Sequence, residues 1–201
     1  MFRLEDGIAA LQEGELVVYP TETFYGLGAD PFSASALKLL FAAKAREPER
    51  PVGMIAADAA MAFSITREVS EPARRLADAF WPGPLTLVLP AREGFAPELI
   101  GADGIGVRVS PHPIARGLAR GLGNPITATS ANLSGEAPAM TLAEARSAFG
   151  AKVKVYLEGG KLTAAAPSTV VAIRRDKVKM IRIGAISEAQ IAAVLAGAVM
   201  K

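Results

Sequence analysis

The sequence lacks cysteine altogether and has a single histidine among its 201 residues. Disulfides, thiolate metal sites and cysteine nucleophiles are therefore excluded, and the composition suits a reducing compartment. The one histidine, His112, lies between two prolines in "SPHPIARG". Histidine-rich metal sites and a helical H-E-x-x-H motif are excluded as well. We interpret His112 as a turn residue rather than a catalyst.

Long apolar runs are also missing. The longest, "IAAVLAGAVM" near the C-terminus, falls well short of the roughly 20 residues that a membrane helix needs. The N-terminal segment carries acidic residues where a signal peptide needs an unbroken apolar stretch. We therefore expect a soluble cytoplasmic protein that has no membrane partner. The net charge of +2 is small, so any basic site has to be local.

The residues that are present favour one compact α/β domain over residues 1–201. The chain is 51% hydrophobic, and its 19 glycines and 14 prolines mark many turns. Apolar spacing and capping patterns predict helices over Leu4–Leu11, over Ala36–Ala45, in "SEPARRLADAF", and from capping boxes at Thr141 and Ser187. Because helices alternate with short strands, we expect a mixed sheet covered by helices.

Short apolar segments between these helices predict the strands of that sheet. The expected strands are "ELVVYP", "PVGMIAA", Leu85–Leu89, Ile105–Val109, Ile126–Thr129, Val153–Leu157, Val170–Arg174 and Val178–Ile183. The last two flank "RDK" and form a predicted hairpin.

Three loops carry more polar groups than a simple connection needs: "PTETFYGLGAD", "KAREPERP" and "PITATSANLSGEAP". The first and third follow predicted strands, where open α/β sheets bind ligands, and their hydroxyl, amide and glycine groups suit phosphates or a nucleotide. The second holds Lys44 and Arg46, which match phosphate or carboxylate groups. Each loop also has a plain alternative: a glycine-rich turn, a solvated helix end, or a turn that satisfies its own backbone.

Familiar nucleotide and hydrolase motifs do not occur. The sequence has neither G-x-x-x-x-G-K-[ST] nor G-x-G-x-x-G, so a bound nucleotide would need another kind of loop. Neither Ser130 nor Ser134 lies in G-x-S-x-G, which weakens a Ser-His-Asp hydrolase interpretation.

Seven strings in a fixed order resemble one known family. They are "YPTETFYGLGAD", "KAREPERP", "FWPGPLTLVLP", "GVRVSPHP", "TATSANLSGEAP", "PSTVV" and "IRIGAIS". Together they resemble the short, single-domain form of the YrdC family of L-threonylcarbamoyladenylate synthases, over about residues 8 to 187. The resemblance implies a twisted mixed parallel and antiparallel α/β sheet, the YrdC-like or RibB-like fold, with a large concave basic face.

The same resemblance implies an activity. The expected enzyme joins L-threonine, bicarbonate and ATP into threonylcarbamoyl-AMP, with release of pyrophosphate, for t6A modification of tRNA. ATP is then a substrate, and Mg²⁺ is held mainly by its phosphates, since no carboxylate cage is evident. Expected partners are tRNA and the t6A transferase complex. Two alternatives stay open: an RNA-binding protein without catalysis, and a YrdC-like enzyme for another amine.

Site residues follow from the resemblance position by position. The catalytic residues are then Lys44 and Arg46. The implied ATP-binding residues are Lys44, Arg46, Arg50, Ser130, Asn132, Pro138 and Arg182. The implied threonine-binding residues are Thr23, Arg108, Ala128 and Ser168. The chain departs from the family pattern at Arg50, Ile55 and Gly104, where many relatives have asparagine, histidine and threonine.

Overall fold

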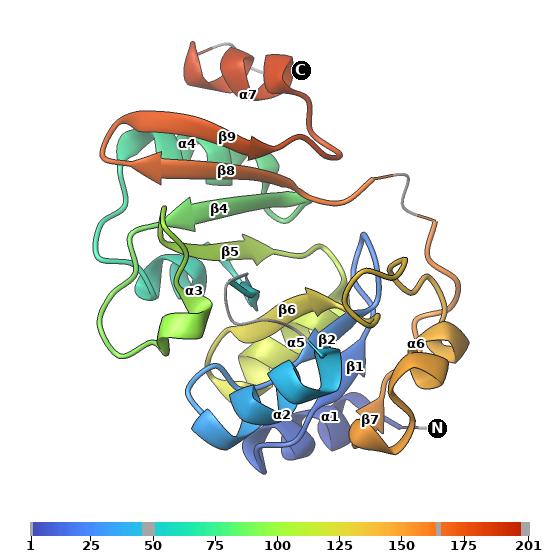
Figure 1. The fold of residues 1–201 in the computed structure, drawn as a ribbon. Helices are drawn as coiled ribbons and strands as arrows, with labels where there is room; N and C mark the ends of the chain where they lie inside the picture. Colours follow the sequence, from blue (N-terminus) through green and yellow to red (C-terminus); the bar gives the residue numbers. More distant parts are fainter. Residues whose placement is uncertain (1, 46–50, 164–165, 198–201) are drawn as a thin grey trace.

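The structure is a computed structural model that describes residues 2–45, 51–163 and 166–197. Its helices are α1 (Leu4–Gln12), α2 (Ala34–Lys44), α3 (Ala59–Ser64), α4 (Glu71–Phe80), α5 (Pro113–Leu122), α6 (Leu142–Phe149) and α7 (Glu188–Leu195), with 3-10 turns η1 (Pro97–Leu99) and η2 (Gly150–Lys152). Its strands are β1 (Val17–Tyr19), β2 (Gly26–Gly28), β3 (Gly53–Ala56), β4 (Leu85–Leu89), β5 (Ile105–Val109), β6 (Ile126–Ser130), β7 (Val155–Tyr156), β8 (Thr169–Arg174) and β9 (Lys177–Arg182). Figure 1 shows their arrangement.

The strands of the described residues form one 9-stranded sheet in the order β7-β1-β2-β6-β3-β5-β4-β8-β9. Three neighbouring pairs, β1–β7, β3–β5 and β4–β8, are parallel. The other five pairs are antiparallel, including the predicted hairpin of β8 and β9. The mixed α/β sheet predicted from the sequence is therefore confirmed, while its basic face stays a prediction.

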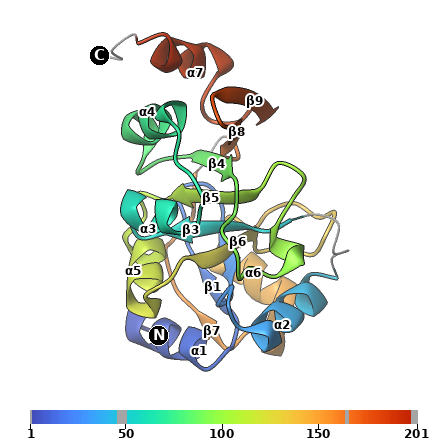
Figure 2. The same cartoon turned by 90° about the vertical axis from the view of Figure 1, so that its left-hand side faces the viewer.

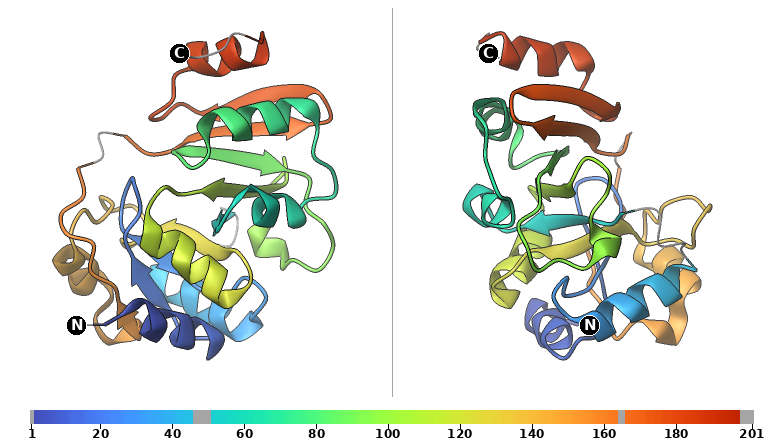
Figure 3. Two further views of the ribbon diagram at one scale, coloured as in Figure 1. Left: turned by 180° about the vertical axis from the view of Figure 1, so that it is seen from behind. Right: turned by 60° about the vertical axis from the view of Figure 1, so that its left-hand side comes forward.

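Helices bury the apolar side chains of this sheet in three clusters. The first cluster lies between α2 and the strands β1, β2, β3 and β5. The second lies between strands β4 and β8 and helices α4 and α7, and the third lies beneath α1 and α5. Figure 2 shows α3, α4 and α5 on one side of the molecule and α2 and α6 on the other. In Figure 3 the view from behind brings α3, α4 and α5 to the front. The strand ends and loops between these helices are left to form a site.

The helix starts follow the capping chemistry of the sequence. Thr141 and Ser187 each accept a hydrogen bond from the third helical residue, which returns a side-chain bond to the cap, so both predicted capping boxes are confirmed. Ser70 is the N-cap residue of α4, with a proline in the first turn, but its hydroxyl makes no capping bond. Instead, that hydroxyl is buried without a partner among the described residues.

Strand β2 and helices α3 and α5 were not predicted; a close contact between strands explains β2, and local N-caps, Asp58 for α3 and His112 for α5, begin the two helices. Strand β2 was expected to be part of a loop, but a Cβ at Gly26 or Gly28 would meet the Tyr19 ring at 2.9 or 2.8 Å, so the glycines let β1 and β2 pack closely. The Tyr19 hydroxyl donates to Thr127 O at 2.9 Å, and burial raises the pKa of this phenol. Helix α5 begins after His112, whose Nδ1 accepts from Ile114 N at 3.3 Å. The predicted turn residue is thus a helix cap.

In the described ranges, no helix combines the length and apolar character needed to cross a membrane.

Candidate active site

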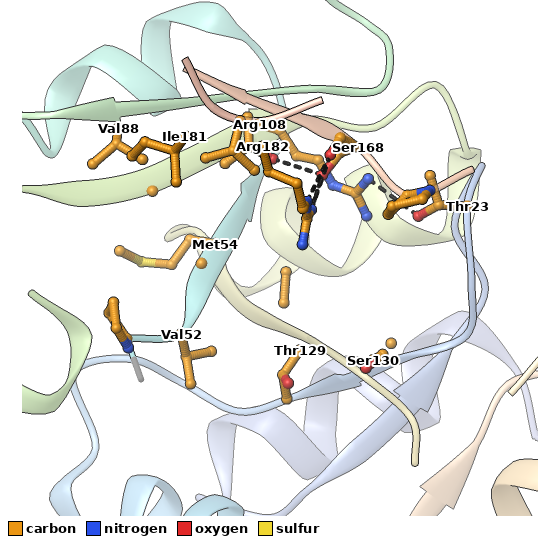
Figure 4. Close-up of a pocket in the computed structure, with 18 of the residues that line it drawn as sticks. Thr23, Val52, Met54, Val88, Arg108, Thr129, Ser130, Ser168, Ile181 and Arg182 are labelled. Atoms are coloured by element: carbon orange, nitrogen blue, oxygen red, sulfur yellow. Dashed lines mark hydrogen bonds between the residues drawn. The ribbon is translucent and has the colours of Figure 1, made fainter. Parts of the chain in front are cut away.

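One cavity of about 760 Å³ lies against the middle strands of the sheet. Figure 4 shows that its lining differs from end to end. Arg108, Arg182, Ser168 and Thr23 gather at one end, whereas the other end is lined by apolar side chains, among them Val52, Met54, Val88 and Ile181. A cavity with a cationic end and an apolar end suits a ligand that carries anionic groups on one part and a ring or apolar group on another.

The floor of the cavity has almost no side chains. Gly53 on β3 pairs with Ala128 on β6, and a Cβ built at Gly106 on β5 would lie 3.7 Å from the Cα of Gly53. All three residues line the cavity. The small residues therefore leave room for a ligand directly on the backbone of three adjacent strands. Ala128, predicted from the family pattern, belongs to this floor.

Arg108 anchors the cationic end. It lies near the end of β5, and its side chain is only 10% exposed. Its Nη1 donates to Glu22 Oε1 at 2.5 Å and to Thr23 Oγ1 at 3.3 Å. Ser110, at the end of the same strand, donates its hydroxyl to the other oxygen of Glu22. The structure thus brings the predicted residues Thr23 and Arg108 together and adds Glu22 and Ser110.

Arg182 supplies a second positive charge close to the first. Its Nη2 donates to Ser168 O at 2.9 Å and to Ser168 Oγ at 3.1 Å, and the Ser168 hydroxyl lies 3.0 Å from Thr86 Oγ1. Burial, and then the nearby charge of Arg108, lower the pKa of the Arg182 guanidinium. Two like charges held in a partly buried cavity attract anionic ligands strongly. The predicted residues Ser168 and Arg182 are therefore adjacent to Arg108.

Lys44 holds the end of β6 and the loop that follows it through hydrogen bonds from its side chain. It is the last residue of α2 and only 3% exposed, and its Nζ donates to Ser130 O at 2.7 Å and to Asn132 O at 2.6 Å. Ser134 N donates back to Lys44 O at 3.2 Å. Ser130 lines the cavity, but Lys44 and Asn132 are not among its lining residues. The predicted group of lysine, serine and asparagine is thus assembled, with the lysine charge directly behind the cavity wall.

Three other residues were predicted to bind ATP: Pro138, Arg46 and Arg50. Pro138 lines the cavity. Arg46 and Arg50, predicted to bind ATP, lie outside the described residues.

Two departures from the family pattern have structural explanations. Ile55 is fully buried in the apolar cluster beneath α1 and α5 and is not one of the lining residues. Gly104 lines the cavity with φ +124°, and a Cβ there would lie 2.1 Å from Leu89 O. A threonine therefore does not fit at position 104 in this backbone.

Sequence reasoning missed Glu22, Ser110 and Thr86. Glu22 lies inside the quoted string "PTETFYGLGAD" and Ser110 inside "GVRVSPHP". Each of these two strings holds a charged residue, Glu22 in one and Arg108 in the other. Opposite charges suggest an ion pair, but the sequence does not show that these two residues meet.

Comparison with known proteins places the chain in a family. The family model for Sua5, YciO and YrdC proteins, described as "Telomere recombination", matches residues 9–184. A threonylcarbamoyl-AMP synthase of Chromohalobacter salexigens is 41% identical over 170 residues, which are 84% of this chain and 91% of that protein. One of Bacillus subtilis is 36% identical over 196 residues, 96% of this chain and 56% of that protein.

A solved structure agrees with these sequence matches. The crystal structure of P. abyssi Sua5 complexed with L-threonine matches with a TM-score of 0.90 at 34% identity, covering 96% of this chain and 57% of that one. The chain thus spans little more than half the length of the Bacillus subtilis and P. abyssi proteins. The family match over most of the chain and the shared fold confirm the resemblance seen in the sequence. This chain belongs to the Sua5, YciO and YrdC family.

Proposed function

We propose that this chain is an ATP-dependent threonylcarbamoyl-AMP synthase that joins L-threonine, bicarbonate and ATP and releases pyrophosphate. The main support is the cationic end of the cavity, where Arg108 and Arg182 lie together beside hydroxyl groups. Relatives of Chromohalobacter salexigens and Bacillus subtilis bear the name threonylcarbamoyl-AMP synthase, and the P. abyssi Sua5 structure holds L-threonine.

The threonine site is proposed at the cationic end. Arg108 binds the substrate carboxylate, because a guanidinium matches a carboxylate with two parallel N–H bonds. The hydroxyls of Thr23 and Ser168 lie beside it and hydrogen-bond polar groups of the amino acid. Ala128 contributes backbone to the floor.

The ATP site is proposed along the neighbouring wall. Arg182, Ser130 and Pro138 line the same cavity, and Lys44 Nζ and Asn132 N both donate to the carbonyl oxygen of Ser130. The assignment of Arg46 and Arg50 to the phosphates rests on the family pattern alone. The lining residues that the structure describes include one carboxylate, Asp103, which is paired with Lys179 at 2.9 Å. We therefore assign Mg²⁺ to the phosphate oxygens of ATP rather than to a protein cage.

The chemistry requires anions to approach one another. Bicarbonate takes up a proton and loses water to give carbon dioxide, and the neutral threonine amine attacks it and releases a proton to solvent. A carbamate oxygen then attacks the α-phosphorus, the bond from that phosphorus to the α,β-bridging oxygen breaks, and pyrophosphate leaves. Two unit charges 4 Å apart repel by about 4 kcal/mol at an effective dielectric constant of about 20. Arg108 and Arg182 offset this repulsion, so positioning and electrostatic stabilisation by fixed charges carry the catalysis. We propose a catalytic role for Lys44 through its charge beside Ser130 and Asn132, and one for Arg46 from the family pattern alone.

The biological setting is also a proposal. The product is labile, since carbamates lose carbon dioxide in water, and we propose that the t6A transferase complex consumes it to modify tRNA. The absence of cysteine from the sequence suits a reducing compartment, and we place the enzyme in the cytoplasm.

The test is direct detection of the product. Purified protein is incubated with ATP, bicarbonate and L-threonine, and threonylcarbamoyl-AMP is measured by mass spectrometry together with pyrophosphate. We expect both products, and neither when threonine is omitted. Salt-sensitive RNA binding without pyrophosphate release would contradict the proposal, and so would faster turnover with another amine than with threonine.

A further inference from the structure

Glu22 connects two loops behind the proposed threonine site. One carboxylate oxygen accepts from Arg108 Nη1 at 2.5 Å, and the other accepts from the Ser110 hydroxyl. The Glu22 side chain is only 14% exposed. Its neighbours Thr21 and Thr23 line the cavity, but Glu22 does not. Glu22 therefore contacts Arg108 from outside the cavity.

The loop that carries Glu22 is itself fixed by hydrogen bonds. Thr21 Oγ1 accepts from Thr23 N at 3.1 Å and from Phe24 N at 3.2 Å, and it donates to Phe24 O at 2.7 Å. On the other side, Ser110 is fully buried, and its Oγ accepts from His112 N at 3.1 Å. Both supports of the carboxylate are thus held by backbone, so Glu22 has a defined position from which to orient a partner.

Glu22 engages only one edge of Arg108. The Arg108 hydrogen bonds to Glu22 and Thr23 both come from Nη1. Among the residues that the structure describes, Nε and Nη2 of Arg108 have no hydrogen-bond acceptor. A guanidinium binds a carboxylate with two parallel N–H bonds. The edge that remains is therefore the one that can receive a ligand carboxylate.

Glu22 also balances charge in this part of the molecule. The charge of Arg108 contributes to the lowered pKa of Arg182, which shows that the two cations repel each other. With a carboxylate behind Arg108, that repulsion is partly offset when no anionic ligand is bound. Without it, Arg108 would be a largely buried cation beside a like charge, and its side chain would be drawn toward solvent.

We propose that Glu22 is a positioning residue: it holds the Arg108 guanidinium so that the Nε and Nη2 edge faces the cavity and receives the carboxylate of the amino-acid substrate. This inference rests on the proposed function and deepens it. Glu22 does not touch the substrate and acts through Arg108 alone.

The test compares Glu22→Ala and Glu22→Gln with the wild type in pyrophosphate release at varied threonine and varied ATP. We expect Glu22→Ala to raise the KM for threonine at least ~10-fold, the order of effect seen when an outer-shell partner is removed, with the KM for ATP nearly unchanged. The Tm should fall, because a largely buried cation loses its partner. Glu22→Gln keeps an oxygen acceptor for Arg108, so we expect it to restore much of the threonine affinity. The control is Glu93→Gln, which alters the exposed ion pair of Arg67 and Glu93 and should leave both KM values unchanged.

A double-mutant cycle separates positioning from mere stability. We expect Ser110→Ala to raise the KM for threonine less than Glu22→Ala, and the double variant to be no worse than Glu22→Ala alone. A wild-type or lowered KM for threonine in both Glu22 variants would overturn the inference, and so would an equal rise in the KM values for threonine and ATP. Failure of the wild type to form product would instead overturn the proposed function, so the two failures are distinguishable.

Discussion

A single glycine shows how little space the backbone leaves in one part of the cavity lining. Gly104 has φ +124°, and a Cβ there would lie 2.1 Å from Leu89 O. Both the backbone conformation and the space therefore demand glycine. We expect Gly104→Ala to lower the free energy of unfolding by about 3 kcal/mol, combining strain at positive φ with overpacking, as measured by urea denaturation.

Gly123 provides the control for this substitution. It has φ +77°, but a Cβ there would meet no atom within 4 Å. Gly123→Ala carries conformational strain alone, and we expect it to cost only about 1 kcal/mol. Equal losses at the two positions would show that the contact with Leu89 O does not matter.

At the residue scale the proposed chemistry is tested most simply at Lys44. Lys44→Met keeps most of the aliphatic side chain and removes the charge behind Ser130 and Asn132. We expect a fall in turnover of at least ~100-fold, the order of effect for losing one preorganised donor, measured as pyrophosphate release. Lys38→Met changes an exposed lysine on the same helix and should be neutral. Wild-type turnover in Lys44→Met would remove Lys44 from the catalytic residues.

At the element scale, helix α6 depends on its capping box. Thr141 Oγ1 accepts from Glu144 N at 3.2 Å. We expect Thr141→Ala to cost about 1 kcal/mol of stability, measured by urea denaturation. Ser70→Ala at the start of α4 is the matched control, because the Ser70 hydroxyl is buried without a partner among the described residues. Its removal should be neutral or stabilising, and a comparable loss there would argue against the capping explanation.

The other half of the same box predicts a pH dependence. Hydrogen bonds from the backbone N–H of Met140 and then of Thr141 lower the pKa of the Glu144 carboxyl. Since the pKa is lower in the folded state than in the unfolded chain, the carboxylate stabilises the fold at neutral pH, and this stabilisation is lost as the pH falls through its folded pKa. We expect the stability difference between wild type and Glu144→Gln to shrink toward zero in acid. A difference that is independent of pH would contradict this assignment.

Many elements with local signals were predicted, but α3 and α5 were missed although each begins at a local cap, and strand β2, which depends on contacts with a neighbouring strand, was missed as well. The capping boxes at Thr141 and Ser187 were read directly from the sequence. Strand β2 was missed, because its glycines pair with β1 only when the Tyr19 ring lies over them. In the site, family resemblance gave residues that do converge, such as Arg108. It could not give the contact of Arg108 with Glu22, because these residues are far apart in the chain and meet only when β5 is placed beside the loop after β1.

At the scale of the whole molecule, the cavity brings together groups from strands near both edges of the sheet. Thr23 follows β1, while Ser168 precedes β8 and Arg182 ends β9, close to the opposite edge. All three line one cavity. We propose that residues 1–201 form a single domain, because the strands of the described residues belong to one sheet. A ligand in the cavity would therefore contact distant parts of the sheet at once and stabilise the fold as a unit.

This arrangement predicts a ligand-dependent melting temperature. A ligand that binds only the folded state at about 100 times its Kd adds about 2.7 kcal/mol of stability, which corresponds to about 5–10 °C for a chain of this size. We expect ATP and threonine each to raise the Tm, measured by scanning calorimetry. Arg182→Ala should lose most of the ATP-induced rise, because it removes a cation from the proposed nucleotide wall. An ATP-induced rise equal to that of the wild type would place the nucleotide away from Arg182, even if the enzyme remained active.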